Sequence, residues 1–449
     1  MDGKNTTEKS KKSDNHYLTG KEIREIAKAN AKEMRRLEKA KNRKCPESEY
    51  LPEMKDDGNI LEIEDLHSYF FTDQGVVKAV NGVSFNIPIN STVGVVGESG
   101  CGKSVTSMSV MRLLQGPTGQ IVSGSIRFKA EDFKRDEKGK PIPVYETDEN
   151  GEVVCAPVLD KKGNPKLDKN GEQILKPVQK TRENGRGIYE TEEKIFDIAK
   201  MPIKQMYKLR GRQMSMVFQE PMTSLNPVFT IGNQLDEVSL LHIPGATKEI
   251  AKMRSIEMLN MVGIAMPERV YASYPHELSG GMRQRVMIAM ALAGEPRLII
   301  ADEPTTALDV TIQAQILDLF NDLKRRINGS ILLITHDLGV IAEMADYVVV
   351  MYAGRIIEKG TASEIFHNPL HPYTKGLQKS KPTMKSNSET LFNIPGNVPN
   401  PMDMPDYCYF KERCSECIGK CSGAYPESVQ VSPTHFVACH LYAQKENKR

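Results

Sequence analysis

A run of eight residues, Gly97 to Ser104, has the residue types and spacing of a phosphate-binding loop. It reads GESGCGKS and matches the pattern G-x-x-x-x-G-K-S. An apolar, β-branched segment, Thr92–Val96, precedes it, and Val105–Leu114 follows with apolar residues at helical spacing. The glycines let backbone N–H groups turn toward phosphate oxygens, and a helix that begins there adds partial positive charge. Lys103 would supply a full charge for the β- and γ-phosphates, and Ser104 is placed to bind Mg²⁺. Because strand, loop and helix follow in the required order, we favour nucleotide binding over a chance glycine-rich turn.

Polar residues also follow three other apolar runs. These runs are predicted strands, and each ends in candidate chemistry: Gln213–Phe218 in Gln219, Leu298–Ala301 in Asp302 and Glu303, and Ile331–Thr335 in His336. In an open parallel sheet a ligand binds outside the carboxyl ends of the strands. Asp302 can hold Mg²⁺ there, and Glu303 can act as a base on an attacking water. Because four polar groups are expected beside a phosphate loop, we favour a single functional site over four unrelated residues with structural roles.

The composition limits the class of protein. The chain has 449 residues, enough for two or three domains, and its formal net charge of +2 shows no overall bias toward nucleic acid. No run of 18 apolar residues is present, and the N-terminal residues lack the apolar core of a signal peptide. These features predict a cytosolic protein.

Residues 1–57 are expected to form a basic N-terminal extension, helical or disordered. Met1 to Lys44 contains 14 Lys and Arg against 7 Asp and Glu. Thr19 and Glu22 have the spacing of a capping box, which predicts a helix through about Lys41. Because the apolar stripe of this helix is thin, a solvated helix or a disordered tail is favoured. A basic arm attracted to anionic lipid head groups is the alternative.

Ile60–Phe71 and Val76–Ile87 predict two strands joined in a hairpin at Asp73–Gly75. Phe70 lies in the first strand and could stack on an adenine base, although ordinary strand packing explains it equally well.

Residues 134–195 differ in character and predict an inserted meander of small hairpins. The pattern D-x-x-G, typical of type I turns, occurs four times: Asp136–Gly139, Asp148–Gly151, Asp160–Gly163 and Asp168–Gly171. A calcium loop is the alternative, but the glutamate expected at its twelfth position does not recur.

Helical patterns without a strong strand fill residues 226–277, and a further helix follows. Ser279 is a sound N-cap for that helix, which runs to Ala293 and stops at Gly294 and Pro296.

The C-terminal segment, 363–449, is rich in proline and holds five of the eight cysteines between Cys408 and Cys439. Cytosolic cysteines favour a metal site or free thiols over disulfides. The segment has few apolar residues with which to build a core of its own, so it is expected to need a staple.

Together these motifs resemble the ATPase subunit of an ATP-binding cassette (ABC) transporter. Leu278–Gln284 reads LSGGMRQ and resembles the family's signature motif, which other phosphate-loop enzymes lack. The resemblance implies an α/β fold over residues 58–362, the insertion apart. That fold is a P-loop NTPase (RecA-like) core with an antiparallel β subdomain and a helical subdomain at 226–290, followed by the small cysteine-containing C-terminal region.

The resemblance also assigns roles to residues. It implies catalytic roles for Glu303, His336 and Gln219, and a magnesium site made by Ser104, Gln219 and Asp302. The residues implied to bind ATP are Phe70, Gly97, Glu98, Ser99, Gly100, Cys101, Gly102, Lys103, Ser104 and Val105. The signature residues implied to face the ATP of a partner subunit are Leu278, Ser279, Gly280, Gly281, Met282, Arg283 and Gln284. Asp309 matches the D-loop.

The C-terminal region resembles that of oligopeptide and dipeptide importer ATPases, and nickel importers share parts of it. The resemblance rests on three segments: HPYT at His371–Thr374, IPGNVP at Ile394–Pro399, and the run from Cys408 through Phe410 and Arg413 to Cys414. In some members four cysteines hold an iron–sulfur cluster, and the matching positions are Cys408, Cys414, Cys421 and Cys439. Four thiolates suit a [4Fe-4S] cluster or zinc, and reduced thiols are the remaining reading; Cys417 is extra.

These resemblances predict an ATP-binding and hydrolysing subunit that energises an importer of di- or oligopeptides through ATP-driven dimer closure. ATP and Mg²⁺ are the expected cofactors. The expected partners are a second ATPase subunit, identical or different, two integral-membrane permease subunits and, indirectly, an extracytoplasmic peptide-binding protein. No nucleic acid is expected, and the predicted location is the cytoplasmic face of the cell membrane. The alternatives are a nickel importer ATPase of the same group and a soluble, non-transport ABC protein.

Overall fold

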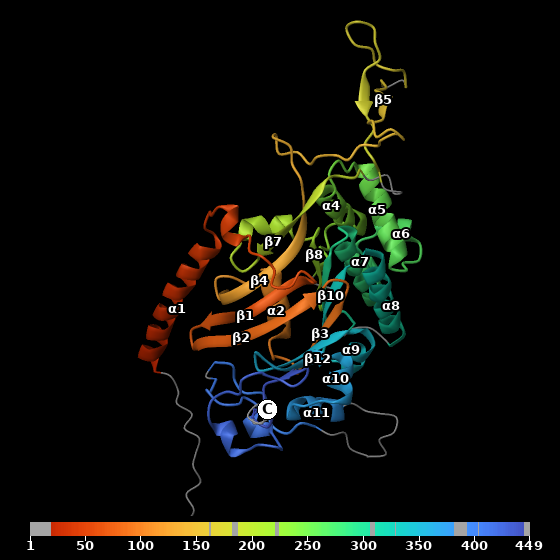
Figure 1. Ribbon diagram of the computed structural model, residues 1–449. Helices are drawn as coiled ribbons and strands as arrows, with labels where there is room; N and C mark the ends of the chain where they lie inside the picture. Colours follow the sequence, from red (N-terminus) through yellow and green to blue (C-terminus); the bar gives the residue numbers. More distant parts are fainter. Residues whose placement is uncertain are drawn as a thin grey trace, which may run out of the picture.

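The computed structural model describes residues 19–160, 163–181, 187–220, 224–305, 310–327, 329–380, 393–402 and 404–443. Two β-sheets form its centre (Figure 1). One is mainly parallel and carries the phosphate loop, and the other is antiparallel.

The mainly parallel sheet has the strand order β13-β14-β12-β11-β3-β10-β9-β8. Its strands are β3 (Thr92–Val96), β8 (Met214–Val217), β9 (Leu298–Asp302), β10 (Ser330–Ile334), β11 (Tyr347–Tyr352), β12 (Arg355–Thr361), β13 (Val429–Gln430) and β14 (Phe436–Val437). Every residue of β3, β8, β9 and β10 is buried, which explains why these strands are almost continuously apolar. The four strands run parallel, so their carboxyl ends meet at one edge.

The antiparallel sheet has the order β2-β1-β4-β7. It consists of β1 (Asn59–Thr72), β2 (Gly75–Pro88), β4 (Gly119–Phe133) and β7 (Thr191–Asp197). β1 and β2 form the predicted hairpin. β7 pairs with β4 from Thr191 opposite Phe133 to Asp197 opposite Arg127. The last residues of the predicted 134–195 insertion therefore belong to this sheet, because Thr191 to Ile195 already pair with Phe133 to Lys129 of β4.

Helices surround the sheets. The α-helices are α1 (Gly20–Lys41), α2 (Lys103–Val110), α4 (Ile231–His242), α5 (Lys248–Met261), α6 (Pro267–Ala272), α7 (Gly280–Ala293), α8 (Val310–Ile327), α9 (Leu338–Met344), α10 (Ala362–His367) and α11 (Pro372–Lys379), and the 3₁₀ helices are η1 (Glu47–Tyr50), η2 (Ile203–Lys208), η3 (Pro275–Glu277), η4 (Lys411–Arg413) and η5 (Gly419–Ser422). In Figure 1, α4 to α8 lie together on one side of the molecule. Within the described ranges, no helix combines the length and apolarity required to cross a bilayer.

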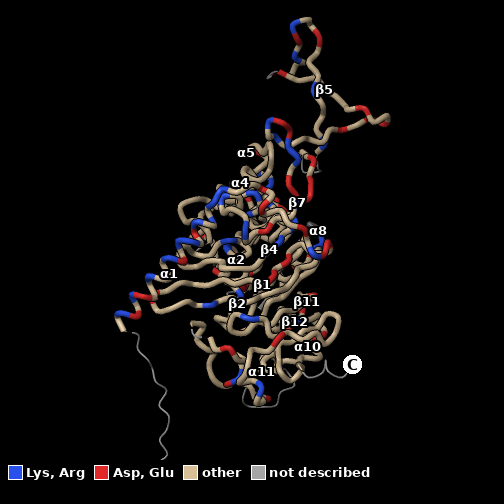
Figure 2. The backbone as a smooth tube through the Cα atoms, turned by 60° about the vertical axis from the view of Figure 1, so that its left-hand side comes forward, with Lys and Arg blue, Asp and Glu red and all other residues tan. Residues whose placement is uncertain are grey.

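Helix α1 has the predicted capping box at Thr19 and Glu22, but it is not fully solvated. It lies along the antiparallel sheet (Figure 1) and carries many Lys and Arg residues (Figure 2). Leu37 is buried, and the buried Asn30 donates to the carbonyl oxygen of Thr72 at 2.7 Å. The preference for a solvated helix or disordered tail was therefore wrong for α1, because the polar Asn30, which interrupts the apolar stripe, is itself a contact to the sheet.

The insertion extends away from the two sheets (Figure 1) and contains the short antiparallel strand pair β5 (Cys155–Pro157) and β6 (Leu175–Pro177). Its Asp-Gly turns have the predicted chemistry. One carboxylate oxygen of Asp148 accepts from the backbone N–H groups of Asn150 and Glu152, both at 2.9 Å. These local bonds let the turns form without a core beneath them.

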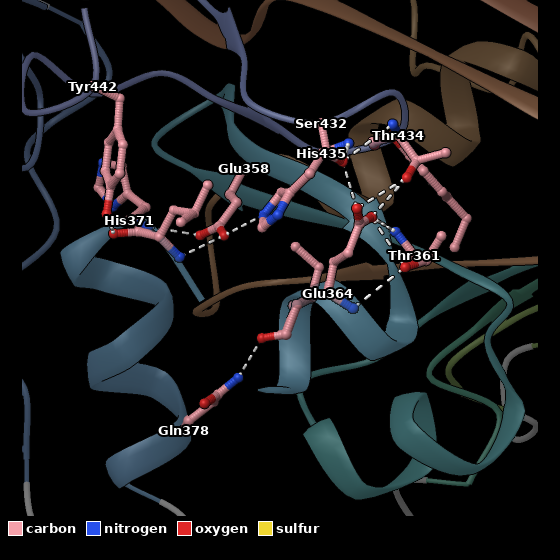
Figure 3. Close-up of polar contacts among 12 residues, drawn as sticks. Glu358, Thr361, Glu364, His371, Gln378, Ser432, Thr434, His435 and Tyr442 are labelled. Carbon is pink, nitrogen blue, oxygen red and sulfur yellow. Dashed lines mark hydrogen bonds and ion pairs between the residues drawn. The ribbon is translucent and has the colours of Figure 1, made fainter. Parts of the chain in front are cut away.

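The C-terminal region is packed onto the cassette and extends its central sheet through β14, which pairs with β12. Figure 3 shows the polar contacts that attach it. The buried carboxylate of Glu358 on β12 accepts from the backbone N–H of His371 at 2.9 Å and lies 2.8 Å from Nε2 of His435. Tyr373 and Phe410 belong to the same apolar cluster as the cassette strands. The region has few apolar residues for a core of its own, but it does not need one, because it packs on the core of the cassette.

Candidate nucleotide site

The phosphate loop lies between β3 and α2. Gly102 has φ +101°, and a Cβ there would lie 2.3 Å from the carbonyl oxygen of Ala79, so only glycine fits this position. Lys103 is buried, and its Nζ donates to the carbonyl oxygens of Gly97 at 2.7 Å and Glu98 at 3.1 Å. The loop is therefore already folded in this structure, and the ammonium group of Lys103 is already held inside it.

Ser104 and Asp302 meet beside the loop. The Ser104 hydroxyl donates to Oδ1 of Asp302 at 3.0 Å, and that of Ser107 donates to Oδ2 at 3.3 Å. Burial raises the pKa of Asp302 above its usual range, and these two hydrogen bonds act against the rise. A hydroxyl and a carboxylate in contact offer the oxygen ligands that Mg²⁺ prefers, so the residues fit the ion.

Gln219, Glu303 and His336 meet at the carboxyl ends of β8, β9 and β10. Glu303 Oε2 accepts from Nε2 of Gln219 at 2.9 Å, and its Oε1 lies 3.2 Å from Nδ1 of His336. Glu303 has φ +48°, a left-handed backbone conformation that is costly for a residue other than glycine. The parallel sheet thus brings together three side chains that are far apart in the sequence.

The signature segment begins helix α7. Leu278 is buried, whereas Ser279 and Gly280 are exposed, and the Ser279 hydroxyl accepts from the backbone N–H of Met282 at 3.3 Å. Gln284 donates from Nε2 to the carbonyl oxygen of Pro304 at 2.6 Å and so connects the helix to the end of β9. Gly281 and Arg283 are half-buried in the first turn. The exposed N-terminus of this 14-residue helix is available to an anion.

The remaining predicted residues are less closely connected to the site. Ser99 and Gly100 are exposed at the tip of the loop, Cys101 is buried, and Val105 is half-buried on α2. Phe70 is half-buried on β1, which pairs it with Gly119 of β4. Its adenine-stacking role stays a prediction. Asp309 lies outside the described residues.

The cysteines of the C-terminal region form no disulfide bonds in the structure. Burial raises the pKa values of Cys408 and Cys439 to about 11, and their charges interact with those of Cys414 and Cys421. The four thiols therefore lie within electrostatic range of one another, so that ionising one disfavours ionising the others. In the part of the chain that the structure describes, however, no three His, Cys, Asp or Glu side chains are placed to hold a metal ion. The predicted iron–sulfur or zinc ligand set is not preassembled.

Arg413 and Tyr373 of the C-terminal region contact the phosphate loop, and no role at the site was predicted for either residue. Arg413 binds the carboxylate of Glu98 with both terminal nitrogens, at 2.6 and 2.9 Å. The Tyr373 hydroxyl accepts from the backbone N–H of Glu98 at 2.8 Å. Both residues stand in the segments that resemble peptide importer ATPases, and this was the only available signal.

The phosphate loop, the Ser104–Asp302 contact and the Gln219–Glu303–His336 cluster define a P-loop NTPase of the cassette type. Two family profiles match the chain. One is described as "ABC transporter" and covers residues 80–154 and 181–306, and the other is "Oligopeptide/dipeptide transporter, C-terminal region" and covers 357–421.

Curated relatives agree with these profiles. The oligopeptide transport ATP-binding protein AppD of Bacillus subtilis is 42% identical over 86% of this chain and 98% of its own length. OppD of the same organism, also an oligopeptide transport ATP-binding protein, is 42% identical over 85% of this chain and 88% of its own. The dipeptide transport ATP-binding protein DppD of B. subtilis is 40% identical over 86% of this chain and 96% of its own. The chain belongs to the ABC transporter ATPases, in the group with the oligopeptide/dipeptide C-terminal region.

Proposed function

We propose that this chain binds and hydrolyses ATP to energise an importer of di- or oligopeptides. The observation that carries the proposal is the set of polar groups at one sheet edge, beside a phosphate loop, in a chain of this family. The oligopeptide and dipeptide transport relatives support peptides as the cargo.

In the proposed reaction, Lys103 pairs with the β- and γ-phosphates and the loop N–H groups hold their oxygens. Ser104 and Asp302, with Gln219, would hold Mg²⁺, which would supply positive charge for the phosphate oxygens. Glu303 takes a proton from the attacking water. His336 lies 3.2 Å from Glu303 and orients its carboxylate.

The proposed working unit is a dimer of cassettes. The first turn of α7, with Ser279 and Gly280 exposed, would cover the γ-phosphate bound by the partner subunit. ATP then favours the closed dimer, and its hydrolysis releases it. Phosphate-dependent closure is the movement that would be passed to a permease.

The proposed docking surface for the permease lies on the helical subdomain, at the cytoplasmic face of the membrane. A groove of 670 Å³ between α4, α5 and α6 is lined by the apolar Phe229, Leu240 and Leu241 together with polar and charged side chains. Next to it Val228 is 73% exposed, and Leu241 is 70% exposed. Val228 directly follows residues 220–227 in the sequence, and we propose that this stretch after Gln219 also lies near the permease. Exposed apolar side chains around a groove suit a helix from a partner protein.

Uptake measurements test the cargo. Cells that lack the chain are complemented with the wild type or with Lys103→Ala, and the uptake of a labelled tripeptide and of nickel is compared. We expect the wild type to restore peptide uptake and Lys103→Ala not to, because the phosphate charge loses its partner. Restored nickel uptake without peptide uptake would assign the chain to the nickel importers. Failure of wild-type protein to bind ATP would refute the proposal as a whole.

The four thiols of Cys408, Cys414, Cys421 and Cys439 are proposed as the place where an iron–sulfur cluster would form, because their donor chemistry suits one. The thiols would have to move closer together, and no step of the ATPase reaction passes through this group. Protein purified without oxygen is expected to be brown and to contain iron and acid-labile sulfide, and Cys439→Ser is expected to bleach it. A colourless preparation with stoichiometric zinc would assign zinc, and one without metal would leave reduced thiols.

A further inference from the structure

The C-terminal region and the phosphate loop are joined at one residue, Glu98. Its carboxylate accepts two charge-assisted hydrogen bonds from Arg413, and its backbone N–H donates to Tyr373. Its carbonyl oxygen accepts from Nζ of Lys103. Glu98 therefore connects the lysine of the site to a segment more than 270 positions away in the chain.

Arg413 is held in place independently of this contact. Its side chain is only 5% exposed, whereas that of Glu98 is 29% exposed. Nε of Arg413 donates to the carbonyl oxygen of Pro395 at 2.9 Å, and one terminal nitrogen donates to the Tyr352 hydroxyl at 3.3 Å. A guanidinium fixed in this way presents a rigid fork that matches a carboxylate.

The surroundings keep this contact rigid. Tyr352, Tyr373 and Phe410 pack against one another, with ring centroids 4.8 to 5.4 Å apart. The buried Glu358 fixes the start of α11 through the backbone N–H groups of Leu370 and His371 (Figure 3). Tyr373 and Arg413 therefore reach the loop from a preorganised support.

We propose that Arg413, through Glu98, is a positioning residue that holds the phosphate loop in its ATP-binding conformation, and that Tyr373 supports the same position. The proposal rests on the proposed ATPase function and gives the C-terminal region a part in the nucleotide site. A loop fixed before ATP arrives loses less conformational freedom on binding, so its anchors should contribute mainly to affinity.

The test separates affinity from turnover. Glu98→Gln keeps the carbonyl contacts and packing of Arg413 and removes only the charge of its partner. The Kd of ATP carrying a methylanthraniloyl fluorophore, and the KM and kcat of ATP hydrolysis, are measured for Glu98→Gln, Arg413→Gln and the double variant. We expect each single variant to raise KM and Kd about tenfold, as for a lost charge-assisted pair that preorganises a site, with kcat near that of the wild type.

Two further variants sharpen the result. Lys411→Gln removes a positive charge from the same turn, η4, where Lys411 pairs with Glu412 and not with the loop, so its KM should not change. Tyr373→Phe removes one hydroxyl and should raise KM less than Glu98→Gln does. The double variant should be no worse than the more affected single variant, because both act through one contact.

The proposal is overturned if Glu98→Gln binds ATP like the wild type, if kcat falls while KM is unchanged, or if the effects of the single variants multiply in the double variant. In any of these cases the ATPase function stands, provided that the wild type hydrolyses ATP and Lys103→Ala does not bind it. Wild-type protein without ATP binding would instead refute the proposed function.

Discussion

Replacing Glu303 by glutamine should separate ATP binding from hydrolysis. In the structure one oxygen of Glu303 accepts from Gln219, and the other lies 3.2 Å from Nδ1 of His336. An amide can keep both contacts, since its oxygen can accept from Gln219 and its NH₂ can donate to the imidazole. It cannot take a proton from water. A general base contributes about 10²- to 10⁴-fold in rate. At about 1.4 kcal/mol for each tenfold change, the loss corresponds to roughly 2.8 to 5.6 kcal/mol of activation free energy.

The assay is steady-state ATP hydrolysis, combined with nucleotide affinity and gel filtration in the presence of ATP. Glu303→Gln should lose at least about 100-fold in kcat, bind ATP with near wild-type affinity and accumulate as a dimer. Glu343→Gln is the matched control, because Glu343 is exposed on α9 and no role in the site is assigned to it. A kcat for Glu303→Gln within threefold of that of the control would refute the assignment of Glu303 as the base.

Three further predictions follow from the structure. Ser279→Arg should leave ATP binding by the monomer unchanged and abolish ATP-dependent dimerisation, because it puts a bulky cation at the exposed start of α7. Full ATPase activity of this variant would contradict the proposed role of α7 in the dimer. Replacing residues 136–187 with a short Gly-Ser linker should keep the protein soluble and active. The two ends of the insertion are already close together, because the backbone N–H of Lys134 donates to the carbonyl oxygen of Glu190 at 3.0 Å. Loss of both solubility and ATPase activity would show that the hairpins belong to the core. Burial acts to raise the pKa of Glu364, but hydrogen bonds from Ser432, Thr361 and Thr434 lower it to about 2. The ionised carboxylate therefore stabilises the attached C-terminal region above pH 4.5, and this stabilisation is lost as the pH falls toward 2. Glu364→Gln should remove that part of the acid dependence in limited proteolysis of the region, whereas an unchanged acid dependence would show that other groups control it.

Much of the nucleotide site could be predicted from local patterns. Each strand that ends at the site is a short apolar run followed by its polar residue, and in the structure these residues meet because parallel strands end at one edge. The contact between Glu303 and Gln219 spans 84 positions, yet sheet topology alone is sufficient to bring such ends together. The arrangement of the C-terminal cysteines could not be predicted from local patterns, because residue type and spacing do not give the distances between their sulfur atoms.

The sequence by itself determined the phosphate loop, the strands of the parallel sheet, the capped start of α7 and the family, because each depends on residues close together in the chain. Only the tertiary structure decided that α1 packs on the antiparallel sheet through Asn30 and that the C-terminal region uses the core of the cassette. It also decided that Arg413 reaches Glu98 across 315 positions. No local pattern encodes such a contact, because it exists only after both segments have packed around Tyr352 and Tyr373 and their burial has made an unpaired guanidinium costly.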